Sequence, residues 1–177
     1  MTAATAAEAS VVAGTVMFTD IVGFTEFTAA RGDGDAVALL ARQEAIVREE
    51  LSDSGRIVKE LGDGLMLWFD DACDAIETGL RLQERFETET SDEDLALWVR
   101  IGMHTGRQSR RGTDLVGHDV NVASRIVNLA SSGEVLASES TVKGAEGRLS
   151  GVQLEQLGPV VMKGIPAPIN LFRAERG

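Results

Sequence analysis

The segment from residue 56 to residue 69, RIVKELGDGLMLWF, constrains the fold more than any other part of the chain. Two strand-like runs are separated by a Gly-Asp-Gly turn centred on Asp63, and an Asp-Gly pair in this setting is a strong signal for a β-hairpin. A buried strand is predicted upstream at residues 15–19, and a helical pattern follows it to about residue 52. Because a tight hairpin joins antiparallel strands, this part of the chain predicts an antiparallel sheet.

The rest of the chain continues the alternation of strands and helices. A helix is predicted at residues 71–88, a strand at 95–107 and a short returning strand at 109–115. A second helix at 117–133, closed by a glycine, leads into a strand at 134–138, and short strands and turns take up the remainder. This order predicts an α+β fold, a sandwich of one mostly antiparallel sheet with helices packed on one face.

Length and composition indicate one soluble domain. The chain has 177 residues, of which 44% are hydrophobic and 25% charged, as is typical of globular proteins. We expect residues 1–12 to form a flexible tail and residues 13–175 to form one domain. The N-terminus lacks signal-peptide features and no apolar run is long enough to span a bilayer, so a cytoplasmic protein without a membrane partner is expected. The single Cys73 cannot form an internal disulfide and is interpreted as a packing residue.

The formal net charge of −11 weighs against a nucleic-acid-binding protein, because no broad basic face is available to follow a phosphate backbone. It does not exclude a small phosphorylated ligand, which needs only a few local cations or a metal ion. Carboxylates suit Mg²⁺, a hard cation that prefers oxygen ligands. Most of the 28 acidic residues are nevertheless expected to do no more than keep the protein soluble.

Two aspartates are candidate metal ligands. Asp20 ends the first strand just before a glycine turn, and Asp63 lies at the hairpin tip. If the first strand pairs with the hairpin, both carboxylates meet at one edge of the sheet, where they repel each other unless one is protonated or a cation bridges them. Taken singly, Asp20 also fits a helix cap and Asp63 an ordinary turn residue.

Two further features near these aspartates suit a nucleotide. The turn at residues 23–25, Gly-Phe-Thr, offers free backbone N–H groups at a helix start, where an anion is favoured. Lys59 lies four residues before Asp63 and, on a regular strand, faces the same way at about 13 Å, roughly 3.3 Å per residue. That distance is comparable to the span of a nucleotide, although an exposed edge lysine is the alternative.

A polar row marks the helix predicted near the C-terminal third. Asn121, Arg125 and Asn128 recur at positions i, i+4 and i+7, beside an apolar stripe with the same spacing. The stripe is expected to face the core and the polar row to flank it. A solvated helix flank is the alternative, but the row contains no acidic partner.

The other candidate cations and histidines lie at the ends of elements. Arg107 ends a predicted strand and Lys163 precedes a glycine near the C-terminus. His104 is interpreted as a structural strand residue and His118 as a loop residue.

Together these segments resemble one family, the class III adenylyl/guanylyl cyclase catalytic domain, in which they occur in the same order. The matching segments are FTDIVGFT (18–25), VKELGDGLM (58–66), IGMHTGR (101–107), DLVGHDVNVASRI (114–126) and VMKG (161–164). The resemblance covers residues 14–174 and implies a ferredoxin-like sheet. A diguanylate cyclase, which has a related fold, would instead show a Gly-Gly-acidic-acidic-Phe hairpin.

The resemblance implies a role for each matching residue. Asp20, Asp63 and the backbone carbonyl of Ile21 correspond to the ligands of two divalent cations, Mg²⁺ or Mn²⁺. Phe24 and Thr25 correspond to the turn around the triphosphate.

Six further positions match. Arg107 and Lys163 correspond to groups that contact the phosphates. Lys59 and Asp114 correspond to the pair that selects adenine, Asn121 to the asparagine that orients the ribose, and Arg125 to the transition-state arginine.

These matches imply an adenylyl cyclase that converts ATP to cyclic AMP and pyrophosphate at two sites of a homodimer interface. Guanylyl cyclase is disfavoured, because guanine reverses the donor and acceptor that Lys59 and Asp114 would match. A non-catalytic nucleotide-binding module is the alternative of a different class. The intact set of Asp20, Asp63, Asn121 and Arg125 argues against it.

Overall fold

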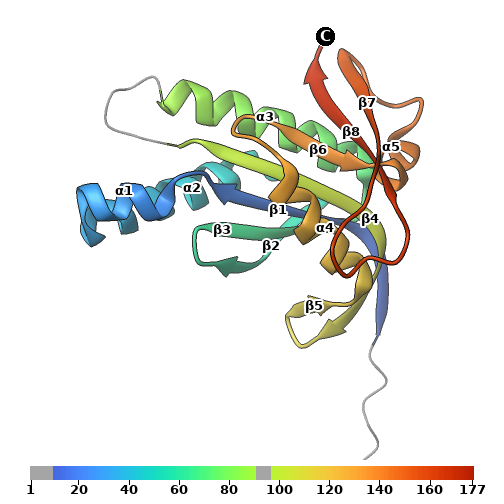
Figure 1. Ribbon diagram of the computed structural model, residues 1–177, viewed down its shortest axis with the longest axis horizontal. Helices are drawn as coiled ribbons and strands as arrows, with labels where there is room; N and C mark the ends of the chain where they lie inside the picture. Colours follow the sequence, from blue (N-terminus) through green and yellow to red (C-terminus); the bar gives the residue numbers. More distant parts are fainter. Residues whose placement is uncertain (1–9, 91–96) are drawn as a thin grey trace, which may run out of the picture.

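The computed structural model describes residues 10–90 and 97–177 of the chain, which form an eight-stranded sheet with helices against it (Figure 1). The strands are β1 (Val11–Ile21), β2 (Gly55–Leu61), β3 (Gly64–Phe69), β4 (Val99–Arg111), β5 (Asp114–Val116), β6 (Val135–Ser138), β7 (Val152–Val160) and β8 (Ile169–Arg176). The helices are α1 (Phe24–Arg31), α2 (Asp33–Glu50), α3 (Ala72–Thr90), α4 (His118–Leu129) and α5 (Glu139–Ala145).

Strand β1 lies inside the sheet. The strand order is β2-β3-β1-β4-β6-β8-β7, and β5 pairs with β4. Strands β4 and β6 are parallel to each other, and the other paired strands of the described structure are antiparallel. The segment from β1 to β4 therefore follows the βαββαβ order of a ferredoxin-like unit, with α2 and α3 as its connecting helices. The predicted α+β class with a mostly antiparallel sheet is confirmed.

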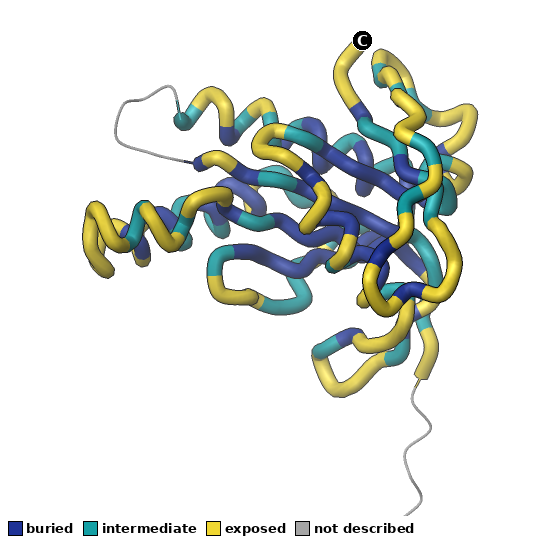
Figure 2. Tube along the Cα trace, in the orientation of Figure 1, coloured by how far each residue is buried: buried dark blue, intermediate teal, exposed yellow. Residues whose placement is uncertain are grey.

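The two faces of the sheet are covered differently. Along β1, Met17 and Ile21 belong to the main core beneath α2 and α3, whereas Val16 and Phe18 pack against α4. Alternate residues of a strand point to opposite faces, so α2, α3 and α5 cover one face, whereas α4, predicted to pack with the other helices, lies on the opposite face. Figure 2 shows the buried segments running through the middle of the sheet.

Three local features differ from the sequence prediction. The helical pattern up to residue 52 is two helices, because Gly32, with φ of 88°, breaks it between α1 and α2. Helix α4 ends at Leu129, before Gly133, which instead lies in a turn whose N–H donates to the Val99 carbonyl. Helix α5 was not predicted, because its seven residues are too few for a clear apolar period.

The N-terminal end of β1 overlaps the predicted tail. Residues 11 and 12 pair with β4, while the first nine residues of that tail lie outside the described part of the chain. None of the described helices is long and apolar enough to cross a membrane.

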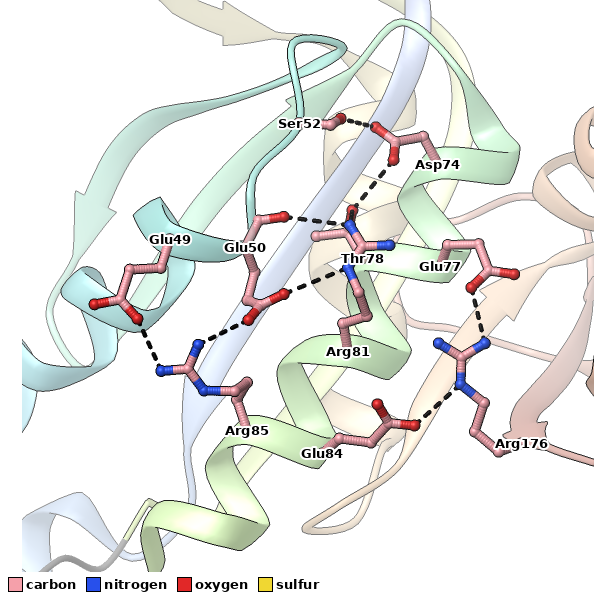
Figure 3. Close-up of polar contacts among 10 residues, drawn as sticks. All are labelled: Glu49, Glu50, Ser52, Asp74, Glu77, Thr78, Arg81, Glu84, Arg85 and Arg176. Carbon is pink, nitrogen blue, oxygen red and sulfur yellow. Dashed lines mark hydrogen bonds and ion pairs between the residues drawn. The ribbon is translucent and has the colours of Figure 1, made fainter.

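Ion pairs join the helix layer on its outer side (Figure 3). Arg85 of α3 contacts both Glu49 and Glu50 of α2 at 2.8 Å, and Arg176 of β8 contacts Glu77 of α3 at 2.8 Å. Such partly exposed pairs contribute little singly, but a network holds long side chains in place. Part of the acidic surplus is therefore engaged in binding the elements together.

One glycine sets how closely α4 approaches the sheet. A Cβ atom on Gly102 of β4 would lie 2.4 Å from the backbone nitrogen of Val127, far inside van der Waals contact. The absence of a side chain at this position therefore fixes the height of α4 above β4.

Gly102→Ala should lower the free energy of unfolding by about 1–3 kcal/mol, the usual cost of overpacking, because the clash is with helix backbone. Urea unfolding measures the change. Gly34→Ala is the matched control: a Cβ there meets nothing within 4 Å, in the first turn of α2, so stability should stay the same or rise. An unchanged midpoint for Gly102→Ala would contradict this account of α4.

Candidate active site

Asp20 and Asp63 meet at one end of the sheet. Asp20 is the penultimate residue of β1 and pairs with Gly64, while the Ile21 N–H donates to the Asp63 carbonyl at 3.1 Å. A Cβ on Gly64 would lie 1.9 Å from the Thr19 carbonyl oxygen, so only glycine allows β3 to start this close to β1. The structure thus brings the two predicted metal ligands together.

The two carboxyl groups affect each other's charge. Burial, followed by the hydrogen bond and the repulsion from Asp20, raises the pKa of Asp63 to about 6. Both side chains are partly buried, so solvent screens the repulsion only in part. A divalent cation between them would remove the same repulsion.

A buried amide network holds the hairpin against β1 on the opposite face. The Thr19 hydroxyl donates to Gln43 Oε1 at 3.0 Å and accepts the Leu65 N–H at 3.2 Å. Gln43 Nε2 donates to the Asp63 carbonyl at 3.4 Å, and this residue of α2 is only 1% exposed. This network could not be predicted from the sequence, because a glutamine within a helical stripe gives no signal until its partners are known.

Arg100 of β4 was also missed. In the register it lies opposite Asp20, and its guanidinium contacts Asp20 Oδ2 through Nε at 2.8 Å and Nη2 at 2.6 Å. The same group donates from Nη1 to the Asn128 carbonyl at 3.2 Å. The sequence places Arg100 inside the strand predicted at residues 95–107, but only the strand register reveals that its partner is Asp20.

Lys59 and Asp114 form an ion pair. Lys59 Nζ lies 2.9 Å from Asp114 Oδ2, and this hydrogen bond lowers the pKa of the carboxyl group below its usual range. A β-bulge between Ile57 and Lys59 adds one residue to β2, which turns Lys59 to the face of Met66, the α4 side. The regular strand assumed in the sequence analysis lacks this bulge.

The polar row of α4 faces solvent. Asn121 and Arg125 are exposed, while Val122 and Ile126 are buried beneath them. Leu129, which continues the spacing of Val122 and Ile126, is 47% exposed because the helix ends there. Within the described part of the chain the Arg125 side chain makes no hydrogen bond or ion pair, so it is free to contact a ligand or another chain.

The predicted phosphate turn opens α1. The helix starts at Phe24 after Gly23, whose φ is 72°, and no side chain caps its first N–H groups. Thr25 is exposed, and Phe24 packs partly against the main core. These N–H groups follow Asp20 directly along the chain.

The backbone of Arg107 is held in place by a hydrogen bond to Asp119. Its N–H donates to Asp119 Oδ2 at 2.7 Å, and Asp119 Oδ1 contacts His104 Nε2 at 3.1 Å. His104 is buried, which lowers its pKa, and it bonds Ser138 through Nδ1 at 2.7 Å. The structural role predicted for His104 agrees with these contacts.

Three other residues singled out in the sequence lie apart from these contacts. Lys163 is exposed between β7 and β8 and, among the described residues, bonds to none of the other site residues. His118 is the first residue of α4 rather than a loop residue, since the helix begins one position after Gly117. Cys73 packs partly against the main core, and burial raises the pKa of its thiol.

The carboxylates of Asp20 and Asp63 suit a hard cation that is also coordinated by oxygens of a substrate. The described residues contain no cluster of three or more His, Cys, Asp or Glu side chains able to hold a metal. Asp20 and Asp63 provide two carboxylates, and Mg²⁺ is commonly held by one or two carboxylates together with substrate phosphates. The residues present therefore fit a divalent cation that binds with a phosphorylated ligand.

Fold and site together define a nucleotidyl cyclase domain. The model of the adenylate and guanylate cyclase catalytic domain matches residues 7–173, and the chain belongs to this family. The resemblance seen in the sequence motifs is confirmed.

The relatives include adenylate cyclases. A pH-sensitive adenylate cyclase of Mycobacterium tuberculosis is 32% identical over 165 residues, 92% of this chain and 41% of that protein. An adenylate cyclase of Streptomyces coelicolor is 34% identical over 116 residues, 65% of this chain and 29% of that protein. The chain thus spans about two fifths or less of these relatives.

Solved structures share the fold. The adenylyl cyclase CyaB of P. aeruginosa has a TM-score of 0.79 at 23% identity, covering 96% of this chain and 97% of that one. The guanylyl cyclase Cya2 has a TM-score of 0.78 at 22% identity, covering 96% and 95%.

The raised pKa of Asp63 makes a prediction about pH. A carboxyl group whose pKa is higher in the folded chain than in the unfolded chain stabilises the fold at low pH, and this contribution is lost as pH rises through about 6. In EDTA, Asp63→Asn should therefore be more stable than wild type at pH 7.5 by about 1–2 kcal/mol, after discounting for solvent screening, and the difference should vanish near pH 4.

Urea unfolding across this pH range measures the difference. Asp53→Asn, at an exposed position, serves as the control and should follow the wild-type curve. Parallel curves for wild type and Asp63→Asn would show that Asp20 and burial do not destabilise the Asp63 charge.

Proposed function

We propose that this domain is an adenylyl cyclase that converts ATP to 3′,5′-cyclic AMP and pyrophosphate. The observation that carries the choice of substrate is the Lys59–Asp114 pair, at 2.9 Å on the α4 face. A lysine donor suits adenine N1 and a carboxylate acceptor suits the N6 amino group. The adenylate cyclases among the relatives support the same choice.

Asp20, Asp63 and the Ile21 carbonyl would hold two divalent cations, Mg²⁺ or Mn²⁺. Bound there, the cations favour ionisation of the ribose 3′-hydroxyl and offset the charge of the leaving pyrophosphate. The chain's contribution is to keep two carboxylates close at the end of β1 and β3, where the Thr19 network and the close approach of Gly64 fix the backbone.

The remaining residues bind and orient the nucleotide. The first turn of α1, with Phe24 and Thr25, offers N–H groups to the triphosphate, and Arg107 and Lys163 add positive charge to the phosphates.

On α4, Asn121 orients the ribose so that its 3′-oxygen is in line with the α-phosphorus. Arg125 stabilises the charge that develops on the α-phosphoryl oxygens, and it is available for this because it has no partner among the described residues.

We further propose that the active form is a homodimer. The α4 face carries partly exposed apolar side chains, Val58, Trp68 and Val120, around a small buried cluster. Apolar groups of this kind are typical of the centre of a protein interface. Two-fold pairing of such faces would place the Asp20 and Asp63 of one chain beside the Asn121 and Arg125 of the other, giving two equivalent sites.

Guanylyl cyclase activity is the second candidate, since guanylyl cyclases such as Cya2 share the fold. Guanine has a donor at N1 and an acceptor at C6, so Lys59 and Asp114 would each meet a like group. Wild-type protein with Mn²⁺ and either ATP or GTP separates the two candidates through the cyclic product. Neither product from either nucleotide would favour a non-catalytic binding module. A cytoplasmic location, where ATP is available, accords with the proposed reaction.

The base-selecting pair can be tested by substitution. Lys59→Glu with Asp114→Cys should lower kcat/KM for ATP by at least about tenfold and admit GTP, because two buried mismatches cost about 1–3 kcal/mol each. Lys143→Glu, at an exposed ion pair on α5, is the control and should leave both values unchanged. A loss of no more than twofold to threefold for ATP would mean that Lys59 and Asp114 do not contact the base.

The homodimer makes a prediction about mixtures. Asp20→Ala and Arg125→Ala should each be inactive alone, yet their mixture should recover roughly a quarter of wild-type activity, because half the molecules become heterodimers with one intact site of two. Asp20→Ala mixed with Asp63→Ala should stay inactive, since each site then carries a lesion in its metal half. With subunit exchange confirmed, no recovery in the first mixture would mean that each chain builds its own site.

A further inference from the structure

The turn that carries Asp63 has conformational freedom. Asp63 lies between two glycines, and Gly62 has a φ of 56°, in the left-handed region. A groove of about 240 Å³ opens between this turn and α2, and it is lined by Gly62 and Gly64 of the hairpin and by Leu40 and Gln43 of the helix. The turn therefore has room to move toward α2 unless specific hydrogen bonds fix it.

The amide of Gln43 makes such bonds at the inner wall of the groove. Its Nε2 donates to the Asp63 carbonyl, which also accepts the Ile21 N–H. Its Oε1 accepts the hydroxyl of Thr19, and this hydroxyl accepts the Leu65 N–H. One side chain of α2 therefore connects the helix to β1 and to two points of the hairpin.

A buried amide at this position needs these partners. Gln43 and Thr19 are 1% and 2% exposed, and the neighbouring inward residues of α2, Leu39 and Ile46, are apolar members of the main core. Burying an amide costs free energy unless its oxygen and nitrogen are hydrogen-bonded. Both atoms of Gln43 are engaged with the end of β1 and the hairpin, so its polarity serves that contact.

The contact opposes a repulsion. When ionised, the carboxylates of Asp20 and Asp63 carry like charges at the ends of neighbouring strands, and separation lowers that energy. Asp20 is fixed by pairing on both edges of β1, opposite Gly64 and Arg100. Asp63, in a turn between two glycines and beside an open groove, is the residue that can move away. The bond from Gln43 holds its peptide carbonyl in place.

We propose that Gln43 is a positioning residue that holds the Asp63 turn against β1 and so keeps the two carboxylates close enough to share a divalent cation. This inference rests on the cation site of the proposed function. It goes beyond that function, because it assigns the geometry of the site to a side chain of α2 on the opposite face of the sheet, outside the proposed metal and nucleotide ligands.

Mn²⁺ binding to the full chain without nucleotide tests the proposal, with free Mn²⁺ followed by electron paramagnetic resonance. Gln43→Met keeps a similar volume without the two hydrogen bonds. It should bind Mn²⁺ about threefold to tenfold more weakly than wild type, the factor that one hydrogen bond is worth. Ile46→Val, one turn along α2, is the matched control, since it removes a methyl group from the main core. It should lower stability and leave Mn²⁺ affinity unchanged.

The partner of Gln43 supplies a second comparison. Thr19→Val keeps the shape of the side chain and removes the hydroxyl, so it should weaken Mn²⁺ binding as Gln43→Met does. Thr19→Ser keeps the hydroxyl and should stay near wild type. The double variant of Thr19→Val and Gln43→Met should lose little more than either single variant, because both changes break the same network.

Hydrogen exchange follows the turn directly. In Gln43→Met the amide protons of Ile21 and Leu65, which bond to this network, should exchange about threefold to tenfold faster than in wild type. Amide protons of α3 should change no more than they do in Ile46→Val, since they report global stability. If Gln43→Met does not fold, Gln43→Asn replaces it, because its shorter amide stays polar and cannot bridge the same two partners.

Unchanged Mn²⁺ affinity, or unchanged exchange of the two amide protons, in the folded variant would overturn the proposal. A wild type that binds no Mn²⁺ would remove the cation site and the proposal with it. Neither measurement uses ATP or turnover. A wild type that produces no cyclic nucleotide but shows the expected Mn²⁺ and exchange pattern would therefore refute the proposed function and leave the role of Gln43 intact.

Discussion

The candidate site depends on the hydrogen bonding of β1 along both of its edges. Because β3 and β4 pair with it up to its last residues, the end of β1 has little freedom, and its side chains alternate strictly between the two faces. Thr19 therefore points to the α2 side, where it bonds Gln43, and Asp20 points to the α4 side, where it bonds Arg100. One backbone register thus places the buried hydroxyl of Thr19 and the carboxylate of Asp20 on opposite faces of the sheet.

Acidic side chains are paired differently in two parts of the molecule. The chain has a large acidic surplus, yet many glutamates of α2 and α3 are engaged with arginines on the outer side of the helix layer (Figure 3). At the end of β1 the balance is different, since Asp20 and Asp63 have one arginine between them. The partial burial of Asp63 and its repulsion from Asp20 together raise the pKa of the Asp63 carboxyl group to about 6.

The α4 face combines the features expected of a site shared between two chains. The ion pair of Lys59 and Asp114 lies on elements that pack on the side of the sheet opposite α2 and α3, and so does Arg125, which has no partner among the described residues. The bulge in β2 is essential here, because without one extra residue Lys59 would point into the helix layer. The glycine at position 102 then allows α4 to lie close enough to reach Arg100.

The sequence by itself determined the order of most elements and the hairpin at Asp63, and it predicted most of the candidate site residues. These depend on local chemistry: apolar periodicity, the Asp-Gly turn, and motifs short enough to be recognised in one segment. It did not predict the break at Gly32 or helix α5, since a glycine in a polar stretch and a seven-residue helix give weak periodic signals. Only the tertiary structure revealed Arg100, Gln43 and the bulge before Lys59. Each depends on contacts between strands and helices far apart in the chain, and a register shift of one residue would send the side chains of Arg100 and Lys59 to the other face of the sheet.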